Sequence, residues 1–143
     1  MNFSELFGNA QWVTCDSGCT SPVIKGGFFI EEPKKAEITI CGLGFFRLWI
    51  NGREVSKDKF VPVNSQYCKR DLTAFEYPIL DELSYRTYAV RYDISEFVID
   101  GENDIRVILG CGWFAQQKRS AEGFAKYGDI KLCYKIDVEN KSG

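Results

Sequence analysis

Aromatic, amide and charged side chains gather in one long stretch, residues 110–128, between two predicted strands. Its candidate contact residues are Trp113, Phe114, Gln116, Gln117, Arg119, Glu122 and Tyr127. A flat aromatic ring can pack on the apolar C–H face of a sugar, while amide and charged groups bond the sugar hydroxyls. The same rings would also suit contact with a neighbouring domain, because such contacts leave aromatic side chains exposed when the partner is removed. This stretch is therefore the candidate site for a carbohydrate or for another domain, and the second use is favoured.

Two further tryptophans could form a sugar platform, although packing is the favoured role for both. Trp49 alternates with the inward side chains of its predicted strand and could lie on either face of the sheet, although packing in the core or under a loop is favoured over sugar contact. Trp12 is expected to hold the amino-terminal segment against the rest of the fold.

Hydrolytic chemistry finds little support in the residue types. The chain has no histidine, which excludes Ser-His-Asp and Cys-His arrangements within it. A glycosidase needs two carboxyl groups roughly 5 to 10 Å apart, one of them with a raised pKa. The acidic candidates all fall at predicted turns or at solvent-facing strand positions: Glu31, Glu32, Glu102, Asp104, Glu122 and Asp129. We therefore assign no catalytic residue to this chain.

Six cysteines leave a choice between redox or metal chemistry and simple burial. Cys15 and Cys19 could form a redox pair or half of a zinc site, but the other cysteines lack the paired spacing of a structural zinc site. Cysteine often behaves as a small buried hydrophobe, so reduced thiols in a cytoplasmic protein are favoured. No metal and no cofactor are expected. The Cys-Gly-Leu-Gly run at 41–44 lacks the glycine and lysine of a phosphate loop and is expected to be a bulge or strand break.

Alternating apolar residues place these side chains on short β-strands. The pattern predicts strands at 129–138, 103–109, 36–41 and 45–50, with further strands at 23–31, 60–63 and 83–92. Alternation marks Leu48, Ile50, Ile105 and Val107 as inward, and it places Cys133 on the solvent-facing side of 129–138. Asn51-Gly52 predicts a tight hairpin turn, with 53–55 returning antiparallel, because both positions tolerate positive φ. One helical turn is expected at 93–97. Long connections remain at 66–82 and 110–128, where loops are often functional.

The whole pattern predicts a single all-β domain over residues 1–143, with a jelly-roll β-sandwich as its fold. The length suits one core. With 18 basic and 20 acidic residues the net charge is −2, so the chain lacks a broad basic surface for nucleic acid. The sequence also contains no apolar run long enough for a membrane span and no secretory signal at its start.

Several segments together resemble the amino-terminal domain of bacterial α-L-rhamnosidases. The segments are Ala-Gln-Trp-Val-Thr at 10–14, the run from 40 to 55 with its Cys-Gly-Leu-Gly and Asn-Gly, Tyr88 with Asp-Ile at 93–94, Gly-Glu-Asn-Asp-Ile at 101–105, and Leu-Gly-Cys-Gly-Trp-Phe at 109–114. The chain departs from the resembled pattern at 62–67, where the family tends to carry a Gly-Trp-Thr type segment, and again at 72–78. The resemblance therefore implies no role for the 66–82 connection.

The resemblance implies a β-sandwich like those of galactose-binding domains. It also implies a non-catalytic module of a longer glycoside hydrolase, whose catalytic carboxylates lie on a separate (α/α)6 barrel. Its partners would be the remaining domains of the parent enzyme, and this chain would be the first domain, ending at a domain boundary. A carbohydrate-binding module that recognises rhamnosides or related sugars is the alternative. No nucleic acid and no membrane are expected as partners.

Overall fold

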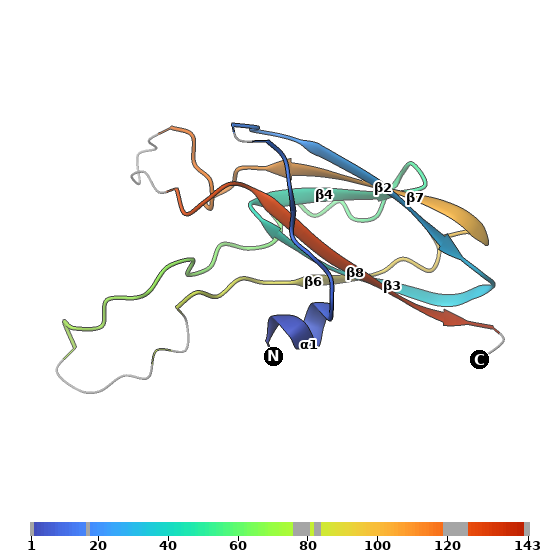
Figure 1. Cartoon of the computed structure of the whole chain (residues 1–143), viewed down its shortest axis with the longest axis horizontal. Coiled ribbons are helices and arrows are strands. Elements are labelled where there is room, and N and C mark those ends of the chain that lie inside the picture. The colour runs from blue at the N-terminus through green and yellow to red at the C-terminus, as the bar shows by residue number, and fades with distance from the viewer. Residues whose placement is uncertain (1, 17, 76–80, 82–83, 119–125, 142–143) are drawn as a thin grey trace.

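Two antiparallel β-sheets face each other across a shared apolar interior (Figure 1). The computed structural model describes residues 2–16, 18–75, 81, 84–118 and 126–141. One sheet has the order β1-β8-β3-β6, and the other has the order β2-β7-β4-β5. The elements, in chain order, are α1 (Phe3–Phe7), β1 (Val13–Thr14), β2 (Val23–Ile30), β3 (Pro33–Leu43), β4 (Phe45–Ile50), β5 (Arg53–Glu54), β6 (Val90–Asp93), β7 (Gly101–Gly110) and β8 (Lys131–Asn140). The predicted all-β jelly-roll sandwich is confirmed.

The interior is built from the alternating apolar side chains that the sequence pattern marked. In β4 and β7, the inward residues lie directly opposite each other, with Leu48 against Val107 and Ile50 against Ile105. The other sheet contributes Ile38 of β3 and its neighbours from the facing side of the core. Because side chains alternate across a strand, this register places every second residue of β4 and β7 in the core and the others on the outer face.

Two glycine-containing turns confirm expectations from the sequence. Asn51 and Gly52 adopt φ values of 49° and 73°, and β5 returns antiparallel to β4. Gly44 separates β3 from β4 with φ 117°, and a side chain there would lie 2.3 Å from the carbonyl oxygen of Gly110. The Cys-Gly-Leu-Gly run is therefore a strand break that lets two backbones approach closely.

The strand prediction was wrong about one face of β8. The alternation predicted that Cys133 would face solvent, yet Cys133 and its direct cross-strand partner Cys41 are both buried. Helix α1 supplies Phe7 to cover them, and Trp12 packs against the same cluster. The role expected for Trp12 is thus confirmed, and the small thiols fit under a helix that the strand pattern could not reveal.

Two other predicted strands differ from the structure. Residues 60–63 form no strand: the segment contributes one backbone hydrogen bond, from Phe46 N to Val61 O at 2.8 Å, and Phe60 has a φ of 60°. In the predicted 83–92 strand, β6 begins only at Val90, where pairing with β3 starts, and residue 83 lies outside the described part. Local alternation predicted these strands, but a strand also needs a neighbour in register. The turn predicted at 93–97 is present, with Val98 N bonded to Ile94 O.

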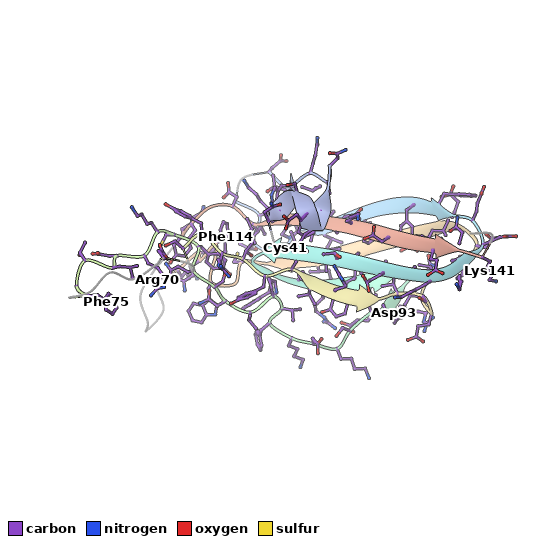
Figure 2. All side chains as sticks on the ribbon, turned by 90° about the horizontal axis from the view of Figure 1, so that it is seen from below. Cys41, Arg70, Phe75, Asp93, Phe114 and Lys141 are labelled. Atoms are coloured by element: carbon purple, nitrogen blue, oxygen red, sulfur yellow. The ribbon has the colours of Figure 1, made fainter. Side chains whose placement is uncertain are left out.

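The two long connections leave the sandwich at the same end, opposite Lys141 (Figures 1 and 2). One joins β5 to β6 and the other joins β7 to β8. None of the described helices is long or apolar enough to cross a membrane. The described candidate contact residues therefore lie at one end of the fold.

Candidate functional site

Backbone hydrogen bonds within the β7–β8 connection link its two described ends to each other. Ala115 N donates to Cys111 O at 3.1 Å, and Tyr127 N donates to Phe114 O at 2.9 Å. Ala115 and Lys126 also form an isolated antiparallel bridge. The described ends of the connection are therefore ordered by main-chain contacts before any side chain contributes.

A cluster of three rings anchors this connection to the other one. The ring centroid of Phe114 lies 5.1 Å from that of Tyr67, at an interplanar angle of 86°, and 6.2 Å from that of Tyr127. Tyr67 and Tyr127 are 5.4 Å apart. Edge-to-face rings at these separations attract each other beyond the effect of apolar burial. Tyr67, Phe114 and Tyr127, the loop aromatic cluster, thus join the β5–β6 and β7–β8 connections.

The candidate residues separate into buried and accessible groups. Phe114 is only 8% exposed and belongs to the core, at the junction between sandwich and connections in Figure 2. Trp113 is 41% exposed and Tyr127 is 44% exposed. Phe114 therefore positions the loop, whereas its neighbour Trp113 presents a ring surface.

The polar candidates are only partly brought together. Gln117 donates to Ala115 O at 3.3 Å, so its amide is turned back onto the loop backbone, and Gln116 is half-buried. Arg119 and Glu122 lie outside the described residues. Among the described candidates, Trp113, Gln117 and Tyr127 are therefore the exposed ones.

Tyr67 belongs to this site although the sequence reasoning assigned it no role. It lies in the 66–82 connection, where the resemblance gave no guidance. Burial raises the pKa of its phenol, so the hydroxyl keeps its proton well above neutral pH. The sequence signal that could have found it is the aromatic residue at the start of a connection long enough to meet the other one.

Trp49 lies on the outer face of the β2-β7-β4-β5 sheet rather than in the core. The guanidinium carbons of Arg47 and Arg106 lie 5.1 and 4.6 Å from its ring centroid. Arg47 also pairs with Glu54, with Nε 2.7 Å from Oε1. Cation–π contacts therefore hold Trp49 in place between two cations, and the expectation that it packs in the core or under a loop was wrong.

The described acidic candidates lie at the surface. Glu31, Glu32, Glu102, Asp104 and Asp129 are exposed, and Asp129 is paired with Lys126 at 3.3 Å. The pKa of Asp71 and that of Asp93 are lowered by hydrogen bonds from Thr73 and Ser95. The general acid of a glycosidase needs a raised carboxyl pKa, which burial or a neighbouring negative charge would supply.

The cysteines are free thiols. Cys15 lies beside Cys19, and partial burial together with the hydrogen bond between them raises the pKa of Cys15. A raised pKa favours the thiol over the reactive thiolate. Within the described residues, no three metal-binding side chains lie close enough to hold an ion.

Two sequence comparisons match the same family of proteins. The profile of the α-L-rhamnosidase N-terminal domain matches residues 31–143. An α-L-rhamnosidase of Formosa agariphila is 33% identical over 86 residues, which cover 60% of this chain and 7% of that protein.

Solved structures show the same fold. The α-L-rhamnosidase of Aspergillus terreus superposes with a TM-score of 0.78 at 20% identity, covering 100% of this chain and 16% of that one. The α-L-rhamnosidase of Dictyoglumus thermophilum gives a TM-score of 0.66 at 25% identity, covering 93% of this chain and 14% of that one. The chain thus spans a small fraction of each relative. It belongs to the α-L-rhamnosidase N-terminal domain family.

Proposed function

We propose that this chain is a non-catalytic, single-domain module of an α-L-rhamnosidase-type glycoside hydrolase, and that it supports the separate catalytic barrel. The observation that carries this proposal is the family match over residues 31–143, together with an 86-residue match that covers only 7% of the Formosa relative. The described carboxyl groups support it further, because those with shifted pKa values are shifted down.

An apolar surface on the β2-β7-β4 sheet suits contact with another domain. Val23 and Ile108 lie opposite each other on its outer side, and Phe60 packs edge-on against Phe45 with ring centroids 5.4 Å apart. Phe45, Phe60 and Ile108 line a groove of about 300 Å³. These residues, the outer apolar face, are the surface we assign to the interdomain contact, because exposed apolar patches often mark such contacts.

The test compares the isolated chain with the whole parent enzyme. Phe60 is 71% exposed, so Phe60→Ser should leave the melting temperature of the isolated chain within about 2 °C of wild type, since surface changes cost little. The same change should lower the melting temperature of the parent by several degrees if Phe60 is buried against another domain. Ile99→Ser, also at an exposed apolar position, is the matched control and should shift neither.

Catalysis by the chain itself is tested separately. The isolated 143 residues should not hydrolyse an aryl α-L-rhamnoside, whereas the parent should. Turnover by the isolated chain would overturn the non-catalytic role. An unchanged parent melting temperature with Phe60→Ser would overturn the assigned contact.

A carbohydrate-binding module is the second candidate. Its support is that Trp113 and Tyr127, two aromatic residues of the same connection, are both exposed at the end of the sandwich. This function predicts saturable binding of a rhamnoside that disappears with Trp113→Ala. Binding that survives Trp113→Ala would remove the loop from consideration.

We also propose a reducing, cytoplasmic setting. The support is that the six cysteines are free, including Cys41 and Cys133, which lie opposite each other on paired strands. Purification without reductant under denaturing, acid-quenched conditions should then yield six titratable thiols. A disulfide recovered from freshly lysed cells would contradict the proposal.

A further inference from the structure

A second groove lies on the outer face of the other sheet, far along the chain from the 110–128 connection. It has a volume of about 490 Å³ and lies between α1 and the segment that leads into β6. Figure 2 shows Cys41, which forms part of its floor, beside α1. Its lining combines apolar and polar side chains: Asn2, Phe3, Leu6, Phe7, Trp12, Cys41, Tyr85, Arg86, Thr87, Tyr88 and Ala89. We call it the α1 groove.

One wall of the α1 groove is aromatic and accessible. Tyr85 is 72% exposed and Tyr88 is 48% exposed, although both stand at the mouth of a groove with a buried floor. On the opposite wall, Trp12 stacks on Phe3 with ring centroids 5.6 Å apart and an interplanar angle of 25°. Flat rings on two sides of a cavity of this size suit a cyclic ligand with an apolar face.

The polar group of the same wall is available to a ligand. The guanidinium of Arg86 forms no hydrogen bond or ion pair with the described residues, so its fork of donors is open. Its backbone is nevertheless fixed, because Arg86 N donates to Gln66 O at 2.9 Å and Ser65 Oγ donates to Arg86 O at 2.5 Å. Binding residues often lie on loops that a rigid scaffold positions, and an unpaired guanidinium offers five N–H donors to a ligand.

The backbone next to Arg86 carries strain. Tyr85 has a φ of 55°, a left-handed conformation that costs an L-residue roughly 1 to 2 kcal/mol. Such strain persists where the surroundings impose it, and it often accompanies a functional site. Here it turns a large ring outward at the edge of the groove rather than into the core.

We propose that the α1 groove binds the pyranose ring of a 6-deoxyhexoside, a rhamnoside in this family. The apolar C–H face would pack on Tyr88, the methyl group would face the floor formed by Cys41 and Ala89, and the ring hydroxyls would accept hydrogen bonds from Arg86. The choice of sugar rests on the proposed function. The groove, its aromatic rings and the unpaired guanidinium of Arg86 are independent of that function.

The test is a titration of the 143-residue chain with methyl α-L-rhamnoside, followed by backbone amide NMR. Saturable shifts should centre on residues 86–89 and on α1, with a millimolar Kd. Tyr88→Ala should raise the Kd at least tenfold. Arg86→Gln, which changes an exposed side chain and keeps the core intact, should raise it at least threefold and guards against a folding defect in the first variant.

Matched controls separate the outcomes. L-Mannose differs from L-rhamnose by one hydroxyl on C6, so methyl α-L-mannoside should bind at least threefold more weakly if the methyl group meets the apolar floor. Trp113→Ala should leave the Kd unchanged, because Trp113 lies in the other connection. Loss of binding in Trp113→Ala but not in Tyr88→Ala, or no saturable shift up to about 100 mM, would overturn the proposal.

The proposed interdomain function fails by a different measurement. It depends on the melting temperature of the parent with Phe60→Ser, and Phe60 packs on Phe45 of the opposite sheet. An absence of sugar binding would therefore leave that role standing, and an unchanged parent melting temperature would leave the α1 groove standing.

Discussion

The side-chain amide of Asn51 donates a hydrogen bond of 2.7 Å to Oδ1 of Asn103, which links the β4–β5 turn to the start of β7. Asn103 is buried, and its own amide donates to Ile99 O at 2.9 Å and to Gly101 O at 3.0 Å. Asn51 Oδ1 in turn accepts from Asp104 N at 2.9 Å. The two asparagine side chains thus provide hydrogen-bond partners for backbone N–H and C=O groups at the end of the sandwich remote from the long connections.

Removing this link should destabilise the fold. Asn103→Ala leaves the amide of Asn51 and the backbone of Ile99 without a buried partner, so the free energy of unfolding should fall by about 2 to 3 kcal/mol. Urea unfolding followed by tryptophan fluorescence measures the change. Asn140→Ala, at an exposed position, is the control. A loss below about 0.5 kcal/mol for Asn103→Ala would contradict the role given to the network.

The adjacent residues Trp113 and Phe114 should respond very differently to truncation. Phe114→Ala removes a ring from the core and from the loop aromatic cluster, and should cost about 3 to 5 kcal/mol. Trp113→Ala removes a half-exposed ring and should cost less than about 1 kcal/mol. Thermal and urea unfolding of the two variants provide the comparison. Equal losses would show that Trp113 also supports the core.

Glycine is required at position 44 for two reasons, and at position 52 for one. Gly44→Ala would place a methyl group 2.3 Å from Gly110 O in addition to its strained φ, so it should cost several kcal/mol. Gly52→Ala meets no atom within 4 Å and should cost only about 1 to 2 kcal/mol from the positive φ. Urea unfolding measures the loss of stability in each variant. The excess loss in Gly44→Ala over Gly52→Ala reports the close approach of residue 44 to Gly110 O. Similar losses would contradict it.

Alkaline pH should weaken the fold through Cys133. Burial, and then the neighbouring Cys41, raises the pKa of Cys133 from 9.0 to about 11. Because the folded state holds the proton more tightly, this contribution is fully present below pH 9 and is lost as the pH rises from about 9 towards 11. The unfolding free energy of wild type should therefore fall more steeply in this window than that of Cys133→Ala.

Between pH 9 and 11, the unfolding free energy of wild type should fall by on the order of 2 kcal/mol more than that of Cys133→Ala, since one pKa unit corresponds to 1.36 kcal/mol. Urea unfolding at pH 8, 9, 10 and 11 on both proteins gives the two slopes, and subtraction removes the titration of lysine and tyrosine. Parallel slopes would show that Cys133 ionises as readily in the folded state as in the unfolded one. Native Cys133 should also resist alkylation at pH 8.

The local sequence pattern was sufficient to predict the core strands β4 and β7 and the hairpin turn at Asn51-Gly52. In β4 and β7, alternation marked Leu48, Ile50, Ile105 and Val107 as inward, and all four are buried. The reason is geometric: a period of two and an apolar face specify a strand and its orientation without knowledge of the partner. Asn51-Gly52 specified its hairpin because few residue pairs accept two positive φ values.

Only the tertiary structure decided which surfaces are covered and which side chains from distant segments meet. Alternation marked Cys133 as exposed, but α1 covers it, and Tyr67 joins Phe114 from a connection to which no role could be assigned. The α1 groove needs residues 2–12 beside 85–89. Sequence thus determined which side chains share a strand face, whereas the packing of segments far apart in the chain determined what lies on it, because contacts across long separations leave no local period to read.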